Sequence, residues 1–186
     1  MKKLLLFFAL ISAVSCSHEN QKINFDLNLD NQKSNIGNGT KLDLQVFDDR
    51  LDKTIGIKEF SSKEKITITS DDNLAIMLRR KINQSLISKG FDEGLDKIVE
   101  IHIKKLEYKA KRKFFIGSSK GEALITVIIK KPENSLTFTK NFSLYLDNKH
   151  FIAPLESTDR DIINNLLQEI TQDILNSDEL LKILAQ

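Results

Sequence analysis

The seven residues Ala123-Leu124-Ile125-Thr126-Val127-Ile128-Ile129 decide the fold of this 186-residue chain. Only Thr126 is polar, so both faces of the segment are apolar. Short apolar runs of this kind are typical of a strand that has neighbours on both sides. We therefore expect 123–129 to form a central strand.

The segments on either side alternate between apolar and polar residues, as half-buried strands do. Residues 99–110 alternate, but the pattern shifts by one position after Lys104-Lys105, which predicts a β-bulge. Residues 136–146 alternate as well, with Lys140 interrupting the apolar face, and we interpret them as a half-exposed antiparallel strand. Residues 41–46 and 66–69 predict two more strands.

Two amphipathic helices complete the pattern. After Ser70, interpreted as an N-cap, apolar residues recur at positions 74, 78, 82 and 86 until Lys89-Gly90-Phe91 ends the helix. Thr158 and Asp161 resemble a capping box before a second helix with an apolar face over 162–174, and 177–186 predicts a short last helix. The sequence thus predicts an α/β protein of the α+β type, with one mixed, mostly antiparallel sheet and both amphipathic helices on one face.

The N-terminus has the form of a bacterial export signal: Lys2-Lys3, an apolar run, and then small residues before Cys16. The apolar run is far shorter than the ~20 residues that a membrane-spanning helix needs. Ala13-Val14-Ser15-Cys16 resembles a lipobox, in which a signal peptidase cuts between Ser15 and Cys16 and Cys16 carries lipid. Several acyl chains make a stable anchor. Ser17, which is not acidic, favours the periplasmic face of the outer membrane.

Three regions follow from this interpretation: a signal peptide (1–15), a lipidated cysteine with a polar tether (16–40), and one periplasmic domain (41–186). Within the tether, apolar residues at 23, 25, 27 and 29 alternate with polar ones and could instead form an edge strand. The 28 basic residues include Lys2 and Lys3, so the mature chain balances its 26 acidic residues. Such a balance gives no reason to expect a nucleic-acid partner.

The lipobox, the tether, the step Val46-Phe47-Asp48-Asp49-Arg50, the helix ending in Lys-Gly-Phe and the strand with Lys140-Asn141-Phe142 together resemble the YajG family of uncharacterised outer-membrane lipoproteins. The resemblance extends over nearly the whole chain. It implies an envelope lipoprotein with no assigned reaction. It also implies a fold related to the N-terminal domain of TolB and to LptE, which bind partners and catalyse nothing.

Few residues offer catalytic chemistry. His18, His102 and His150 are too dispersed to predict a metal site, and we expect them to face solvent. Asp48, Asp49 and Asp52 with Arg50 could form a carboxylate cluster for acid/base chemistry or for a cation. We interpret Asp48 and Arg50 instead as organising a turn, since no His or Lys nearby completes a recognisable catalytic set. Residues 118–121, Ser-Ser-Lys-Gly, lack the context of a phosphate loop and are interpreted as a hairpin turn.

One basic segment could bind an anionic surface such as lipopolysaccharide or phospholipid. Its residues are Lys109, Lys111, Arg112, Lys113, Phe114 and Phe115. The alternative is a solvated strand end whose charges discourage aggregation. We expect no enzymatic activity, no metal and no cofactor other than the lipid on Cys16. The expected function is a binding or adaptor module in the envelope with a protein or lipid partner, and the alternative is an accessory protein that handles lipid or lipopolysaccharide.

Overall fold

The computed structural model describes residues 20–61, 64–113, 116–132, 137–150 and 155–186. Cys16, the signal segment, His18 and the pair Phe114-Phe115 lie outside these residues, as do the side chains of Arg112, Lys113 and His150. The elements are β1 (Gln21–Lys22), β2 (Lys41–Asp48), β3 (Gly56–Glu59), β4 (Lys65–Thr69), α2 (Leu74–Ser88), β5 (Asp92–Glu93), β6 (Lys97–Lys113), β7 (Ile116–Lys130), β8 (Thr137–His150), α3 (Glu156–Leu175) and α4 (Asp178–Ala185).

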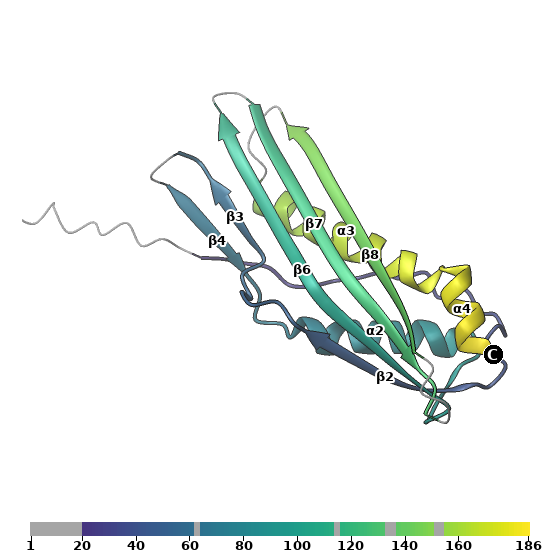
Figure 1. Cartoon of the computed structure of the whole chain (residues 1–186). Helices are drawn as coiled ribbons and strands as arrows, with labels where there is room; N and C mark the ends of the chain where they lie inside the picture. Colours follow the sequence, from purple (N-terminus) through teal and green to yellow (C-terminus); the bar gives the residue numbers. More distant parts are fainter. Residues whose placement is uncertain (1–19, 62–63, 114–115, 133–136, 151–154) are drawn as a thin grey trace, which may run out of the picture.

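The described strands form one mixed sheet of eight strands, and α2, α3 and α4 lie on one of its faces (Figure 1). Its longest ladders are antiparallel, β6 with β7 and β7 with β8. β2 and β3 pair in parallel with β6. The predicted fold class is therefore confirmed. None of the described helices is long and apolar enough to cross a membrane.

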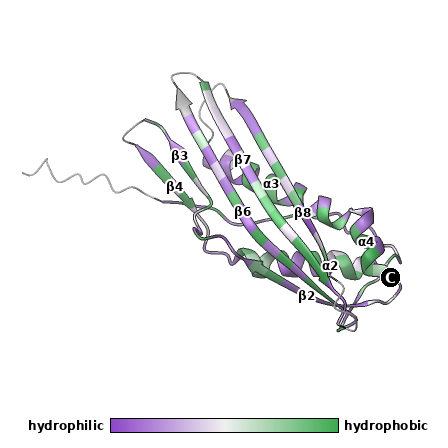
Figure 2. Ribbon diagram, in the orientation of Figure 1, coloured by the Kyte–Doolittle hydropathy of each residue, from purple (hydrophilic) through white to green (hydrophobic). Residues whose placement is uncertain are grey.

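The apolar stretch 123–129 lies in β7, between β6 and β8, as predicted. Its odd-numbered residues are buried against the helices, whereas Leu124, Thr126 and Ile128 are half-buried on the open face. Figure 2 shows the apolar residues gathered in the halves of β6 and β7 that lie away from their shared hairpin. The register shift between Ile103 and Lys105 confirms the predicted bulge, which keeps apolar residues on the helix side.

The segment 20–40, hereafter the strap, is part of the folded body. Leu27 is fully buried, and Ile23 and Leu29 are nearly so. The backbone N–H groups of Asp26, Asn28 and Asp30 donate to amide oxygens of α3, which lie one turn apart. These oxygens are Asn164 Oδ1, Gln168 Oε1 and Gln172 Oε1, at 3.1, 3.0 and 3.1 Å.

The structure therefore corrects the expected boundary at Lys41, because a tether over the whole of 16–40 would leave these apolar residues in water. The alternation at 23–29 predicted burial correctly, but only Gln21–Lys22 is a strand. Side-chain amides, rather than a neighbouring strand, satisfy the strap's alternate N–H groups.

Two predicted helix caps are wrong. Asn73, not Ser70, caps α2, because its side chain accepts a hydrogen bond from the N–H of Ile76. α3 begins at Glu156 after Leu155, which makes no side-chain cap. At the end of α2 the prediction holds: Gly90 has a φ of +87°, and the N–H of Phe91 donates to Leu86 O at 3.1 Å.

The predicted hairpin turn at 118–121 is also wrong, since all four residues belong to β7. The ladder between β6 and β7 continues up to the pair Lys113 and Ile116. Residues 118–121 therefore lie within the ladder and not at its turn. Polar residues such as Ser118 and Lys120 fit β7 there because they alternate with the buried side.

Candidate functional site

β2 and β3 lie one after the other along the same edge of β6. β2 pairs with Lys97 to Ile103 and β3 pairs with Tyr108 to Lys111. Between them the chain leaves the sheet over 49–55, opposite the bulge in β6. This break opens a groove of about 480 Å³ between the 49–57 loop and residues 104–109 of β6.

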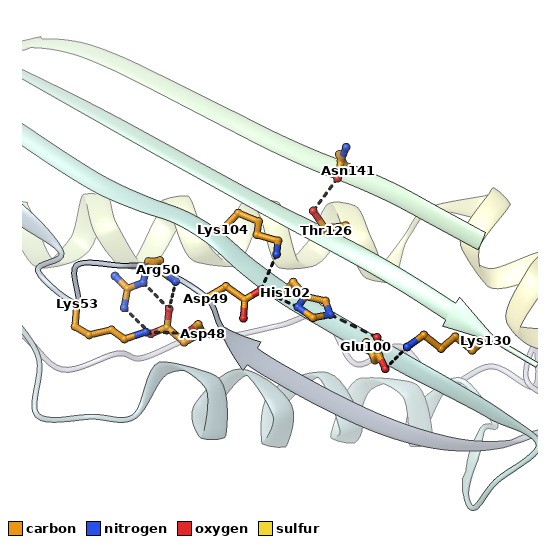
Figure 3. Close-up of polar contacts among 10 residues, drawn as sticks. All are labelled: Asp48, Asp49, Arg50, Lys53, Glu100, His102, Lys104, Thr126, Lys130 and Asn141. Atoms are coloured by element: carbon orange, nitrogen blue, oxygen red, sulfur yellow. Dashed lines mark hydrogen bonds and ion pairs between the residues drawn. The ribbon is translucent and has the colours of Figure 1, made fainter. Parts of the chain in front are cut away.

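Asp48 and Arg50 organise this loop, as predicted. Arg50 Nε and Nη2 donate to the two carboxylate oxygens of Asp48 at 2.8 and 2.9 Å, and Lys53 Nζ donates to the Asp48 carbonyl at 2.7 Å (Figure 3). Burial alone would raise the pKa of Asp48, but the hydrogen bonds and charge of Arg50 outweigh it, so the pKa lies below its ordinary value. Asp52 accepts a hydrogen bond from the N–H of Thr54 at 2.8 Å, another local turn contact.

Asp49 belongs to a different group, which the fold assembles from two strands. Its Oδ2 accepts from Lys104 Nζ at 2.6 Å and lies 2.8 Å from His102 Nδ1 (Figure 3). The hydrogen bond from Lys104, and then the one with His102, lowers the pKa of Asp49. The sequence pattern around 48–52 did not indicate that a His and a Lys lie beside this carboxylate. The pairing of β2 with β6 brings 47–49 beside 102–104, a long-range contact that spacing along the chain does not reveal.

His102 is half-buried, which corrects the expectation that it faces solvent. Its ring stacks on Phe47 with centroids 5.0 Å apart. On its other side, Nε2 lies 3.5 Å from Glu100 Oε2, and Glu100 accepts from Lys130 at 2.5 Å. Lys130, and then His102, lowers the pKa of Glu100.

The polar groups around His102 are mostly engaged with one another. The cross-strand neighbour of His102 is Thr126, whose hydroxyl donates to Asn141 Oδ1 at 2.7 Å (Figure 3). The carboxylates of Asp48, Asp49 and Glu100 are each engaged by cations. Among the described residues, Arg50 Nη1 is buried without a hydrogen-bond partner, and the buried His102 Nε2 has only the 3.5 Å contact with Glu100 Oε2. Among the described residues no three His, Cys, Asp or Glu side chains lie together as metal ligands would.

The basic segment lies at the far end of β6. Lys109 pairs with Glu107 at 3.3 Å and Lys111 with Glu59 at 2.9 Å, and both amines remain exposed. Arg112 and Lys113 continue the strand, paired with Gly117 and Ile116. The two predicted cations whose side chains are described are therefore partly neutralised by neighbouring carboxylates. The remaining predicted site residues, Ser15, Cys16, Phe114 and Phe115, lie outside the described residues.

One buried polar network was missed. Asp159 of α3 is fully buried and accepts from Lys58 Nζ of β3 at 2.6 Å and from the Tyr108 hydroxyl of β6 at 2.7 Å. Burial, and then the bond with Asp159, raises the pKa of Tyr108 far above its ordinary value. One feature of the sequence indicates that Asp159 is buried. It lies four residues before Ile163, on the buried side of α3.

Between the sheet and the helices, the side chains of the described residues leave little empty space. Where β2, β6 and β7 face α2, α3 and α4, the remaining void measures about 10 Å³. Its lining is Leu44, Ile82, Leu86, Val99, Ile101, Val127, Ile174, Leu175, Leu180, Leu181 and Leu184. A void of this size holds at most about one water molecule.

Comparison with solved structures finds the same fold elsewhere. A Xanthomonas campestris protein of the DUF330 family superposes with a TM-score of 0.57 at 7% identity, covering 88% of this chain and 95% of that one. A predicted lipoprotein from Caulobacter crescentus gives a TM-score of 0.39 at 12% identity, covering 60% of this chain and 82% of that one. The first likeness shows a shared fold.

A search of curated proteins finds no match. The model of a protein family described as "uncharacterized lipoprotein" matches residues 28–185, which include nearly all of the described elements. This match agrees with the resemblance seen in the lipobox and in the order of the elements. The chain therefore belongs to this YajG-type family of uncharacterised lipoproteins.

Proposed function

We propose that this lipoprotein is anchored in the outer membrane through lipid on Cys16, and that its periplasmic body is a non-enzymatic binding or adaptor module. The lipobox and the family support the anchor. Ser17 supports sorting to the outer membrane. The partner is another component of the envelope, and the proposal involves no cofactor besides the covalent lipid.

The closed core is the observation that carries the adaptor role. A protein that shields an acyl chain needs an apolar cavity, and ligand pockets typically measure ~300 to 1,000 Å³. The void between sheet and helices here measures about 10 Å³. The larger hollows among the described residues are open surface grooves of about 420, 480 and 510 Å³. Grooves on the outside suit contact with another macromolecule better than lipid storage.

The strap gives the anchor a short reach. The folded body begins at about residue 20. Only four Cα–Cα intervals therefore separate it from Cys16. Four residues span at most ~14 Å. The body therefore stays close to the membrane, where it meets membrane-bound or nearby partners.

Lipidation and sorting are tested by labelling cells with radioactive palmitate and then separating the two membranes. The unaltered protein should incorporate the label and fractionate with the outer membrane. Cys16→Ala should remain an unlabelled precursor, whereas Ser15→Ala keeps a small residue before the cut and should be labelled normally. Ser17→Asp should shift the labelled protein toward the inner membrane. Palmitate incorporated into Cys16→Ala would refute the anchor.

The adaptor role is tested by photocrosslinking in intact cells. A photoreactive residue in place of Phe47 or Tyr145, both exposed on the open face, should yield discrete protein adducts. The same residue in place of Leu166, which is fully buried, should yield none. Native mass spectrometry should find no stoichiometric lipid beyond the anchor. One bound lipid per chain would favour the lipid-handling alternative instead.

A further inference from the structure

A second groove, of about 420 Å³, lies between the outer edge of β2 and helix α2, which runs alongside that strand (Figure 1). Its lining comes from the start of β2, from one exposed stripe of α2, and from the turn after β5. The lining residues are Leu42, Asp43, Leu44, Ile76, Arg79, Arg80, Asn83, Glu93, Gly94 and Leu95.

The outer edge of β2 has backbone N–H and C=O groups that pair with no described strand. Successive residues of a strand direct their N–H and C=O groups to opposite sides. The N–H of Asp49 donates to Ile103 O in β6, whereas the C=O of Leu42 accepts from Gly94 on the outer side. The even-numbered residues of β2 therefore face outward, and Leu44 and Val46 present N–H and C=O groups that no described strand takes up.

The chain itself shows that this edge accepts a strand. β5 pairs in parallel with Lys41 and Leu42 and ends after two residues. Beyond it, the edge continues uncovered by any described strand to Asp48, over about six residues. An added strand that starts where β5 stops would run in the groove beside α2.

One side of the groove, hereafter the helix wall, is formed by the exposed stripe of α2 and by Leu95 in the turn after β5. It supplies both apolar contact and charge. Ile76 and Leu95 both line this groove and are 68% and 72% exposed, so the groove presents two large apolar side chains to solvent. Arg79 and Arg80 are exposed and form no ion pair or hydrogen bond with any described residue. Lys104, Lys105, Lys120 and Lys130, by contrast, each pair with a carboxylate. The two carboxylates in the lining, Glu93 and Asp43, already accept from neutral amides, Asn83 and Gln45.

We propose that this groove binds an extended peptide segment of an envelope protein by β-strand addition to β2. The peptide's backbone pairs with Leu44 and Val46, an apolar side chain packs on Ile76 and Leu95, and an acidic side chain meets Arg79 and Arg80. The inference deepens the proposed adaptor function and rests on it. Main-chain pairing provides affinity and the helix wall provides selectivity, as in other strand-addition modules.

Two synthetic heptapeptide pools test the proposal against the purified full-length protein in detergent micelles. Both pools carry Val, Ile or Thr at positions 1, 2, 4, 6 and 7. Positions 3 and 5 are Asp or Glu in one pool and Lys or Arg in the other, so that apolar and charged side chains share one face of the added strand. NMR of the amide groups should show shifts at Leu44, Val46 and Ile76 with the acidic pool only. The double variant Arg79→Glu/Arg80→Glu should weaken acidic-pool binding at least tenfold, while the matched reversal Arg160→Glu on α3 should leave it unchanged.

Backbone pairing is tested separately with N-methylated peptides from the acidic pool. Methylating one alternate set of amides should abolish binding, and methylating the other set should not, because only one set faces β2. The proposal is overturned if the acidic pool shifts none of the three amides at 1 mM, if the charge reversal changes nothing, or if both methylated sets bind equally. Crosslinks from Phe47 or Tyr145 in cells, together with such a failure, would keep the adaptor function and remove only this groove.

Discussion

At the scale of single residues, the buried triad of Asp159, Lys58 and Tyr108 ties α3 to β3 and β6. Asp159→Ala would leave the ammonium group of Lys58 buried without its carboxylate, so we expect the free energy of unfolding to fall by ~3 to 5 kcal/mol. Tyr108→Phe removes the hydroxyl that donates to Asp159 and should cost ~1 to 3 kcal/mol. Denaturant unfolding followed by circular dichroism measures both.

The control for this triad removes both charges together. Lys58→Met/Asp159→Leu leaves no unpaired buried charge, so it should be markedly more stable than Asp159→Ala alone. If the double variant is no more stable than the single one, then the ion pair between Lys58 and Asp159 does not explain the loss.

The pair of Asp48 and Arg50 predicts a pH dependence. The pKa of Asp48 is held below its ordinary value of 3.8, so the folded state favours the carboxylate. The resulting stabilisation is complete above the ordinary pKa and is lost as the pH falls through the lowered one. The difference in unfolding free energy between the unaltered protein and Asp48→Asn should therefore be constant above about pH 5 and shrink toward pH 2. In an Arg50→Met background that trend should vanish, and its persistence there would show that Arg50 is not its cause.

At the scale of elements, the strands and helices were predictable where a period was long and regular. The alternation at 41–46, 99–110 and 136–146, and the four-residue spacing over 74–86, correspond to β2, β6, β8 and α2. The fold also explains why a charged residue, Lys140, interrupts the apolar face of β8. Its ammonium contacts Ser177 Oγ at 3.0 Å and Glu179 Oε2 at 2.8 Å, at the start of α4.

The missed features depend on contacts between distant parts of the chain. β3 has only four residues, too few to show a period, and its partner Tyr108 lies about fifty residues later. The strap was misjudged because its polar residues suggested a tether. The amides that bind it, Asn164, Gln168 and Gln172, belong to a helix almost 140 residues away. The groups around Asp49 and Asp159 were missed for the same reason.

The strap gives a matched pair of substitutions within one segment. Leu27 is fully buried and Ile36 is 46% exposed. Leu27→Ala should lower the free energy of unfolding by ~2 to 5 kcal/mol because it opens a cavity in the core. Ile36→Ala should cost ~0.5 kcal/mol or less. Similar values for the two variants, measured by urea unfolding, would mean that the strap does not belong to the cooperative core.

At the scale of the whole molecule, β1 and the proposed peptide groove lie in different parts of the sheet. β1 lies beside β4, which pairs with β3, which pairs with the second half of β6. Three strand spacings place Gln21 ~14 Å across the sheet from Tyr108. Leu42 instead pairs with Lys97, at the other end of β6, ~46 Å along the strand from Lys111. Gln21, the first residue of β1, and the basic end of β6 therefore lie in the same half of the body, and the β2/α2 groove lies toward the other end.

This geometry predicts how the lipidated protein sits on a bilayer. A dye on Lys111→Cys should transfer energy strongly to acceptor-labelled headgroups in vesicles, while a dye on Leu95→Cys should transfer weakly. The reason is that the chain between Cys16 and the body spans at most ~14 Å, less than a third of the distance between the two dyes. A twenty-residue Gly/Ser insertion after His18 frees the body to turn and should bring the two efficiencies together. Equal efficiencies without the insertion would show that the short connection does not orient the body, and that the groove is no farther from the membrane than the basic strand end.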